Sequence, residues 1–376
     1  MMKKKMTTII SMLLAVVLLT SCAGTAATTT AAAALTTTQT TAQTTAAQAT
    51  AAQTTAAATT AVTSTDPTTA AEFPVTITDH LGRTVEITRM PETIVSGYYI
   101  STSLLIALGM EDKLVGIEAK ADKRPIYKLS APELLDLPNV GTAKEFNLEA
   151  TAALKPDLVI LPVKLKDAIQ TLTDMGITVI GINPESEEEL TQAIEMIGKA
   201  TGTSERASEL LAASNQLSEK AASFGKDEPA QIVYLAGNSS FLSTAGSNMY
   251  QSSLITNAGA QNAAASITDD YWAEVSYEQL LQWQPDLIVI TPEAVYSADD
   301  IKNDAAVSSL TAVMEGHIYQ MPKQFEAWDS PVPSGVLGEL YMASILYPGK
   351  YSADEFAADV RDFYQRFYGF EADVNA

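Results

Sequence analysis

A repeated pattern at residues 148–160 and 277–290 decides the fold of this chain. In the first copy Leu148-Glu149 leads to Lys-Pro-Asp-Leu-Val-Ile at 155–160, and in the second Tyr277-Glu278 leads to Gln-Pro-Asp-Leu-Ile-Val-Ile at 284–290. The glutamate precedes the proline by seven residues in both copies, and each Pro-Asp pair introduces a continuous apolar run. The repeat predicts two related lobes, each with a buried strand after its Pro-Asp pair.

Outward from the repeat, short apolar strands alternate with helical stretches such as 103–108 and 165–175. This alternation is typical of an α/β fold with mainly parallel sheets covered on both faces. A β-hairpin is predicted before it, because apolar and polar residues alternate at 75–78 and 84–87. The predicted parallel strands are 93–96, 114–117, 158–161 and 178–182 in one lobe, and 231–235, 287–290 and 317–320 in the other.

A long helical region separates the two alternating series. Glutamates at 185–189 begin it, where they complement the helix dipole, and Gly198 and Gly202 mark a break between two helices. The predicted organisation is an N-terminal lobe at 73–184, a helical connector at 185–225 and a C-terminal lobe at 226–376. A ligand is expected in the cleft between the lobes, near the carboxyl ends of the strands.

The first 72 residues are predicted to direct and tether the protein. Lysines at 3–5 precede an apolar run at 9–19, and Leu-Thr-Ser-Cys at 19–22 resembles the bacterial lipobox. We therefore expect a lipoprotein signal peptide at 1–21 and lipidation of Cys22, which would hold the protein outside the cytoplasm on the bacterial cell membrane. Residues 22–72 are rich in Thr and Ala without apolar periodicity, so a disordered tether is predicted.

The composition excludes several classes of function. The chain has 376 residues with 45 acidic and 23 basic side chains, so nucleic acid is not an expected partner, because phosphate binding needs a surplus of Lys and Arg. One cysteine rules out a framework of internal disulfides. Two histidines and no glycine-rich phosphate loop argue against an enzyme, and no catalytic residue, resident metal or cofactor is expected. We expect a monomer.

Several short motifs, in their order and spacing, resemble one family of binding proteins. They include Ile-Thr-Asp at 77–79 with Leu-Gly-Arg at 81–83, Val140-Gly141, both Pro-Asp entries, Asn-Ala-Gly-Ala-Gln-Asn at 257–262 and Ile-Tyr-Gln-Met-Pro at 318–322. The chain resembles a cluster A, or class III, substrate-binding lipoprotein of an ATP-binding-cassette importer, from the group that handles iron siderophores, haem and cobalamin. The resemblance implies two Rossmann-like lobes joined by a long helical connector, with a ligand cleft between them and delivery of the ligand to a permease.

The same resemblance implies a role for the two glutamates of the repeat. Glu149 and Glu278 occupy the positions at which this family presents one acid per lobe to arginines of the permease. Two carboxylates on separate helices would give an orientation-specific pair of charge-assisted contacts. A solvated helix residue is the alternative for each of them.

Candidate ligand-binding residues are aromatic and basic side chains in loops that follow strands. Aromatic faces suit the periphery of an iron chelate or a corrin, and bases form the local positive patch that an anionic chelate needs. Packing in the core is the alternative for the aromatic residues, and surface charge balance is the alternative for the bases. The candidates are Tyr98, Tyr99, Trp272 and Trp328 among the aromatic residues and Lys120, Arg124 and Lys164 among the bases.

The sequence leaves the identity of the ligand open. An iron-siderophore-like chelate is the leading prediction, a cobalamin-type corrinoid is second, and haem and oxyanions such as molybdate follow. A different class of function, a surface adhesin or sensor on a stalk, uses the same features without transport. The expected partners are thus a small-molecule metal chelate or corrinoid, an ABC permease, and the membrane through the lipid anchor.

Overall fold

The computed structural model describes residues 73–269 and 271–374 of the chain. The predicted signal peptide, Cys22 and the tether lie outside the described residues. No helix within the described ranges is long and apolar enough to cross a membrane.

The first lobe is built on a parallel sheet of four strands in the order β4-β3-β5-β6. All residues of β3 and β5 are buried, because helices cover the sheet and leave no face of these strands for water. The strands are β3 (Ile94–Ser96), β4 (Leu114–Gly116), β5 (Leu158–Pro162) and β6 (Thr178–Ile182). The helices of this lobe are α1 (Tyr99–Ala107), α2 (Pro125–Ser130), α3 (Leu148–Ala153) and α4 (Lys166–Asp174).

The second lobe contains a mixed sheet in the order β10-β8-β7-β11-β12, with β9 also paired to β7. Its parallel strands follow the order β9-β7-β11-β12, which repeats the order of the first sheet. The strands are β7 (Ile232–Ala236), β8 (Ser243–Thr244), β9 (Gln261–Asn262), β10 (Ala273–Glu274), β11 (Leu287–Ile290) and β12 (Ile318–Gln320). Helices α7 (Tyr250–Asn257), α8 (Tyr277–Trp283), α9 (Ala298–Lys302) and α10 (Thr311–Glu315) accompany them. The α/β class and the two related lobes are confirmed.

The aspartates of the repeat tie neighbouring strands together. One carboxylate oxygen of Asp157 accepts hydrogen bonds from the backbone N–H groups of Glu92 at 3.0 Å and Thr93 at 3.2 Å, just before β3. The carboxylate of Asp286 accepts a hydrogen bond of 2.7 Å from the N–H of Ile232, the first residue of β7. In each lobe the strand that follows Pro-Asp therefore lies beside the first strand of that lobe.

Two long helices connect the lobes, α5 (Glu187–Thr201) and α6 (Ser204–Gly225). Gly202 ends α5 with a φ of 75°, a left-handed conformation that glycine adopts without strain. The predicted break between two helices falls at Gly202, and Gly198 lies inside α5. A Cβ there would lie 2.6 Å from the Cβ of Ala207, so this glycine allows α5 to pack closely on α6.

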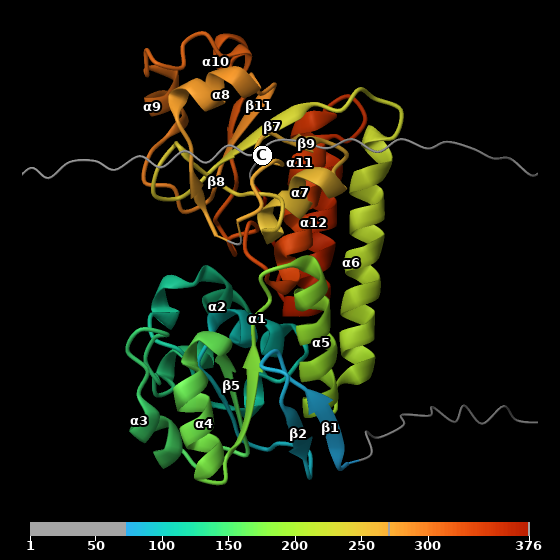
Figure 1. Ribbon diagram of the computed structural model, residues 1–376. Helices are drawn as coiled ribbons and strands as arrows, with labels where there is room; N and C mark the ends of the chain where they lie inside the picture. The colour runs from blue at the N-terminus through green and yellow to red at the C-terminus, as the bar shows by residue number, and fades with distance from the viewer. Residues whose placement is uncertain (1–72, 270, 375–376) are drawn as a thin grey trace, which may run out of the picture. The chain divides into compact units, whose positions relative to one another are not determined.

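The C-terminal helices α11 (Val336–Leu346) and α12 (Ala353–Tyr368) join the second lobe to the first. Helix α11 packs along α6, and α12 extends to α1 of the first lobe (Figure 1). At that contact the hydroxyl groups of Tyr368 and Ser103 lie 2.8 Å apart. The last helix of the chain therefore completes the packing of the first lobe.

The hairpin of β1 (Val75–Thr78) and β2 (Thr84–Ile87) is held to the first sheet by Asp79. The Asp79 carboxylate is buried and accepts hydrogen bonds from the Arg83 guanidinium at 2.6 Å and the Gly181 N–H at 3.0 Å. It also accepts hydrogen bonds from the backbone N–H groups of Leu81 and Arg83. Residues 79–83 are thus explained by the attachment of the hairpin to β6.

Helix α1 begins at Tyr99, four residues before the predicted start. In the structure the Ser101 hydroxyl donates a hydrogen bond of 2.8 Å to the carbonyl oxygen of Tyr98, and the Thr102 hydroxyl donates one of 2.7 Å to the buried carboxylate of Glu118. Tyr99 therefore lies in the first turn of a helix that follows β3.

Glu339 of α11 is 3% exposed, and its Oε1 accepts a hydrogen bond of 3.2 Å from the amide of Asn257. Its Oε2 is buried without a hydrogen-bond partner among the described residues. Burial, and secondarily the carboxylate of Glu187, raise the pKa of Glu339 from 4.5 to about 7.

We expect Glu339→Gln to stabilise the protein at pH 8. The raised pKa means that the folded state holds a proton that the unfolded state loses, so this contribution is complete below pH 4.5 and is lost as the pH rises through about 7. The gain at pH 8 should be at most about 3 kcal/mol and should vanish near pH 4.5. Urea unfolding at both pH values measures it, with the exposed Glu188→Gln as a control of equal charge change. If Glu339→Gln were less stable than the wild type at pH 8, the ionised Glu339 carboxylate would not destabilise the folded state.

Candidate functional site

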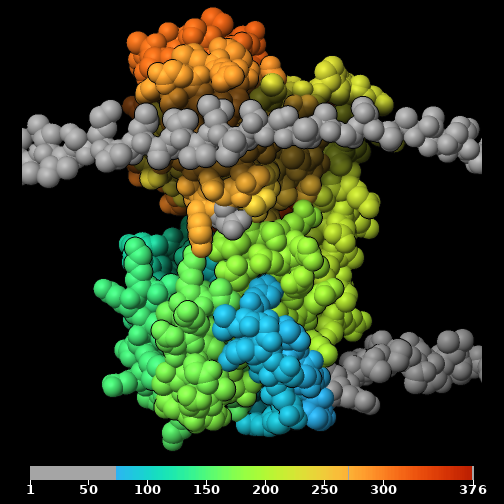
Figure 2. Space-filling view, in the orientation of Figure 1, coloured from blue at the N-terminus to red at the C-terminus, as the bar shows by residue number. Residues whose placement is uncertain are grey.

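A cavity of about 420 Å³ is lined by loops of both lobes, at the carboxyl ends of their strands. Figure 2 shows the seam at which the two lobes meet. Segments after β3 and β4 supply the wall from the first lobe, and segments after β7, β11 and β12 supply the wall from the second. This is the place at which an open α/β sheet binds its ligand. The polar side chains of the lining are Tyr99, Lys120, Lys123 and Arg124 from the first lobe and Asn238, Glu293, Lys323, Glu326 and Ser330 from the second.

The lining is basic although the chain is acidic. Four bases and two acids face the cavity, whereas the whole sequence has 45 acids and 23 bases. Three of the bases, Lys120, Lys123 and Arg124, come from one short segment after β4. A concave wall of one sign of charge attracts an oppositely charged ligand, so the cavity suits an anion.

Arg124 is the most firmly held of these bases. Its Nε lies 3.3 Å from the carboxylate of Glu118, and its guanidinium carbon lies 4.1 Å from the centre of the Tyr99 ring. No described residue accepts a hydrogen bond from its Nη1 or Nη2. These two nitrogens leave a planar pair of donors for a carboxylate or another oxyanion.

The opposite wall contains carboxyl groups in a poorly hydrated setting. Glu326 accepts hydrogen bonds from the hydroxyls of Ser334 at 2.5 Å and Tyr368 at 3.3 Å. Burial raises the pKa of Glu326, and it raises the pKa of the neighbouring buried Asp329 to about 7. Repulsion of an anion from this wall is therefore weaker than the number of carboxyl groups implies.

Three of the predicted ligand-binding residues lie together on the cavity: Tyr99, Lys120 and Arg124. Tyr98 does not line it, and packs edge-on against Tyr99 with ring centres 5.2 Å apart. Lys164 also lies elsewhere, with its Nζ 3.9 Å from the Glu185 carboxylate and 6.0 Å from the ring of Tyr271. The strand-following loops line this cavity, but the sequence did not show which of their side chains turn into it.

The two predicted tryptophans are packing residues and not walls of the cavity. Trp328 is 1% exposed, and its indole N–H donates a hydrogen bond of 2.8 Å to the hydroxyl of Tyr364. Trp272 is partly buried beside Gly237, at the end of β7, where a Cβ would lie 2.8 Å from its ring. A tryptophan in a loop can be covered by elements distant in sequence, so its place after a strand does not show which way its ring faces. For Trp328 these are residues of α12.

Four lining residues of the second lobe were not predicted from the sequence: Asn238, Glu293, Lys323 and Glu326. Each follows a strand of the second lobe by a few residues, so the signal that identified Lys120 was present for them also. Glu118 was missed too, and it is 5% exposed. Glu118 is the second residue after β4. A buried carboxylate needs hydrogen bonds or a paired charge, but the sequence does not show that this one is buried.

Glu149 and Glu278 occupy equivalent places in the two lobes. Each is exposed at the second position of a short helix, α3 or α8, after a capping side chain, Asn147 or Ser276. In Figure 1 both helices lie on the side away from α6. Neither glutamate lines the cavity.

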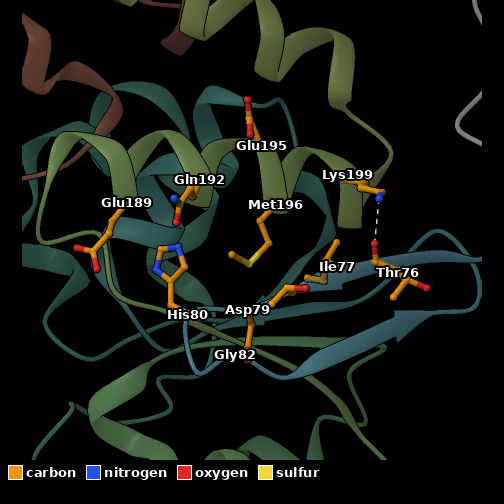
Figure 3. A pocket seen from close by; sticks show the side chains of 11 residues that line it. Thr76, Ile77, Asp79, His80, Gly82, Glu189, Gln192, Glu195, Met196 and Lys199 are labelled. Atoms are coloured by element: carbon orange, nitrogen blue, oxygen red, sulfur yellow. Dashed lines mark hydrogen bonds between the residues drawn. The ribbon is translucent and has the colours of Figure 1, made fainter. Parts of the chain in front are cut away.

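A second hollow, of about 730 Å³, lies between the hairpin and α5 (Figure 3). Two of its polar groups have partners within the fold: Lys199 donates to the carbonyl oxygen of Thr76 at 2.9 Å, and Nδ1 of His80 accepts the N–H of Asn183 at 2.7 Å. Nε2 of His80 is buried without a hydrogen-bond partner among the described residues. The hollow is lined only by residues of the hairpin and of α5, so nothing from the second lobe faces it. We therefore place the candidate site in the smaller cavity between the lobes.

Comparison with known proteins identifies similar chains. A family model described as periplasmic binding protein matches residues 94–325. The molybdate-binding protein MolA of Haemophilus influenzae is 27% identical over 78% of this chain and 88% of its own length. Its molybdate-bound structure matches with a TM-score of 0.68 at 25% identity, over 80% of this chain and 100% of that chain.

Two relatives from Bacillus subtilis are also similar. An uncharacterized ABC transporter substrate-binding lipoprotein, YvrC, is 30% identical over 73% of this chain and 86% of its own length. The Fe(3+)-citrate-binding protein YfmC is 28% identical over 54% of this chain and 65% of its own length. The ligands named for these relatives are thus an oxyanion in one case and an iron chelate in another.

Trp328→Ala should destabilise the fold by about 3–5 kcal/mol, the usual cost of deleting a buried tryptophan. The Tyr364 hydroxyl loses its donor, and the edge-on packing against Phe356 is lost. The free energy of unfolding in urea tests this, and Trp328→Phe, which keeps a ring, should cost less. If Trp328→Ala were as stable as the wild type, Trp328 would not be a packing residue and would again be a candidate ligand contact.

Proposed function

Because the chain belongs to the periplasmic binding protein family and is a substrate-binding protein of the ABC-transporter type, we propose that it captures an iron-siderophore-like chelate outside the cytoplasm and delivers it to a permease. Membership of this family also makes it a binding protein and not an enzyme. The observation that carries the proposal is the basic cavity between the lobes, with the donor pair of Arg124 unoccupied by any described residue.

The size and chemistry of the cavity support a small organic chelate. A volume of about 420 Å³ falls in the range of pockets for organic ligands, about 300–1,000 Å³. Carboxylate groups of a chelator would pair with Arg124, Lys120 and Lys123, and its donor groups would face Glu293. A relative whose name includes Fe(3+)-citrate supports the same class. A flat corrinoid or haem receives less support, because Trp272 and Trp328 do not line the cavity.

An oxyanion is the second candidate, because MolA is similar over most of this chain. Molybdate would use the same bases. Glu293 in the lining counts against it, since a bare oxyanion offers no donor to a carboxylate.

Lipidation of Cys22 and docking of the permease by Glu149 and Glu278 complete the proposal. The name of one relative as a lipoprotein supports the first. The equivalent exposed positions of the two glutamates support the second. A stalked adhesin or sensor would need neither the basic cavity nor this symmetric pair.

Binding of ferric citrate to the purified protein, measured by calorimetry beside molybdate, cyanocobalamin and haemin, tests the ligand class. We expect ferric citrate to bind and Arg124→Gln to weaken it by roughly 10- to 100-fold, the loss typical of a hydrogen bond to a charged group. Arg361→Gln on α12 is the matched control and should bind like the wild type. Binding of molybdate alone would replace the proposal by its second candidate.

The docking role predicts that Glu149→Gln with Glu278→Gln lowers uptake while leaving ligand affinity unchanged. Each change removes a charge from an exposed helix end and keeps the size of the side chain. Affinity for the permease should fall by roughly tenfold or more for each charge, and less at high salt. Transport into vesicles that contain the permease measures the effect, with the exposed Glu219→Gln of α6 as control. Normal uptake by the double variant would contradict the assignment.

A further inference from the structure

Glu118 lies beneath the cavity as a buried carboxylate with three partners. It is the second residue after β4 and is 5% exposed. Its Oε2 accepts a hydrogen bond of 2.7 Å from the hydroxyl of Thr102 on α1, and its Oε1 accepts one of 2.7 Å from the hydroxyl of Tyr127 on α2. Both donors are fully buried. The third partner is the Nε edge of Arg124, at 3.3 Å.

The burial of this group requires its partners. A carboxylate removed from water is costly unless it is paired with a charge and hydrogen-bonded. Thr102 and Tyr127 supply the hydrogen bonds, and burial followed by the charge of Glu118 raises the pKa of Tyr127, which keeps its phenol protonated. The single cation in contact with Glu118 among the described residues is Arg124.

The arrangement fixes both the edge and the face of the Arg124 guanidinium. Glu118 lies at ion-pair distance from the Nε edge, where Nε itself makes no hydrogen bond, the Tyr99 ring covers one face, and Nη1 and Nη2 remain for a ligand. The hydroxyl of Thr102 also lies 2.7 Å from that of Ser96, the last residue of β3. The anchor of the guanidinium is therefore built into the sheet and two helices, and not into a loop. A group held in this way loses little rotamer freedom when it binds an anion.

We propose that Glu118 is the positioning residue that orients Arg124 for bidentate capture of a carboxylate of the ligand. The ligand part of this inference rests on the proposed function, whereas the orientation of Arg124 does not. Glu118 does not line the cavity itself, so any effect on binding must pass through Arg124.

The first experiment needs no ligand. In the free protein, the Nε–H of Arg124, assigned by its loss in Arg124→Lys, should give a resolved NMR signal with restricted motion. Glu118→Gln keeps the size of the side chain and removes its charge, and should make this group mobile. Asp122→Asn is the matched control, because Asp122 is an exposed acid close to Arg124 in sequence that pairs with Lys123. A wild-type signal that is already mobile, or one unchanged in Glu118→Gln, would overturn the proposal.

The second experiment is a double-mutant cycle with ferric citrate as the probe. We expect Glu118→Gln to weaken binding by about tenfold in the wild-type background and to have no further effect in the Arg124→Gln background. Equal losses in both backgrounds would mean that Glu118 acts by supporting the fold, and would overturn the positioning role. If the wild type binds none of the probes, the proposed function fails, and the NMR result alone decides whether Glu118 orients Arg124.

Discussion

The structure depends on the hydrogen bonds by which Asp157 and Asp286 bring the strand of each repeat beside the first strand of its lobe. These contacts set the two central strands parallel and in register. Parallel strands end at one edge of their sheet. In the first lobe the segments after β3 and β5 therefore emerge at one edge, and in the second lobe the segments after β7 and β11 do the same. The cavity exists because both lobes turn this edge toward each other, and its bases are grouped because they follow strand ends.

The sequence predicted the architecture well because the information for it is local. Apolar strands bounded by Pro-Asp, acids at the start of α5 and the turn residues of the hairpin each reflect a short-range preference. The observed β6 and β11 have the predicted bounds. Helix α1 begins four residues before its predicted start. Within it, the Thr102 hydroxyl donates to Glu118, a contact that only the folded chain provides.

The site could be predicted as a region but not residue by residue. Lys120, Arg124 and Tyr99 were found by their place after strands, and the same rule placed Trp272 and Trp328 there. Whether a loop side chain faces the cavity or the core depends on elements that pack on it from distant parts of the sequence. For Trp328 that element is α12, and for Arg124 it is the buried Glu118, whose burial no local pattern reveals.

The contact between Tyr368 of α12 and Ser103 of α1 has a consequence for biogenesis. A chain is synthesised from its N-terminus, so the first lobe is available to fold before α12 exists. Yet α12 packs on α1 of that lobe. Until α12 (Ala353–Tyr368) has been made, α1 keeps an uncovered apolar face. Loss of the C-terminus through an early stop codon would therefore damage the lobe farthest from it in sequence.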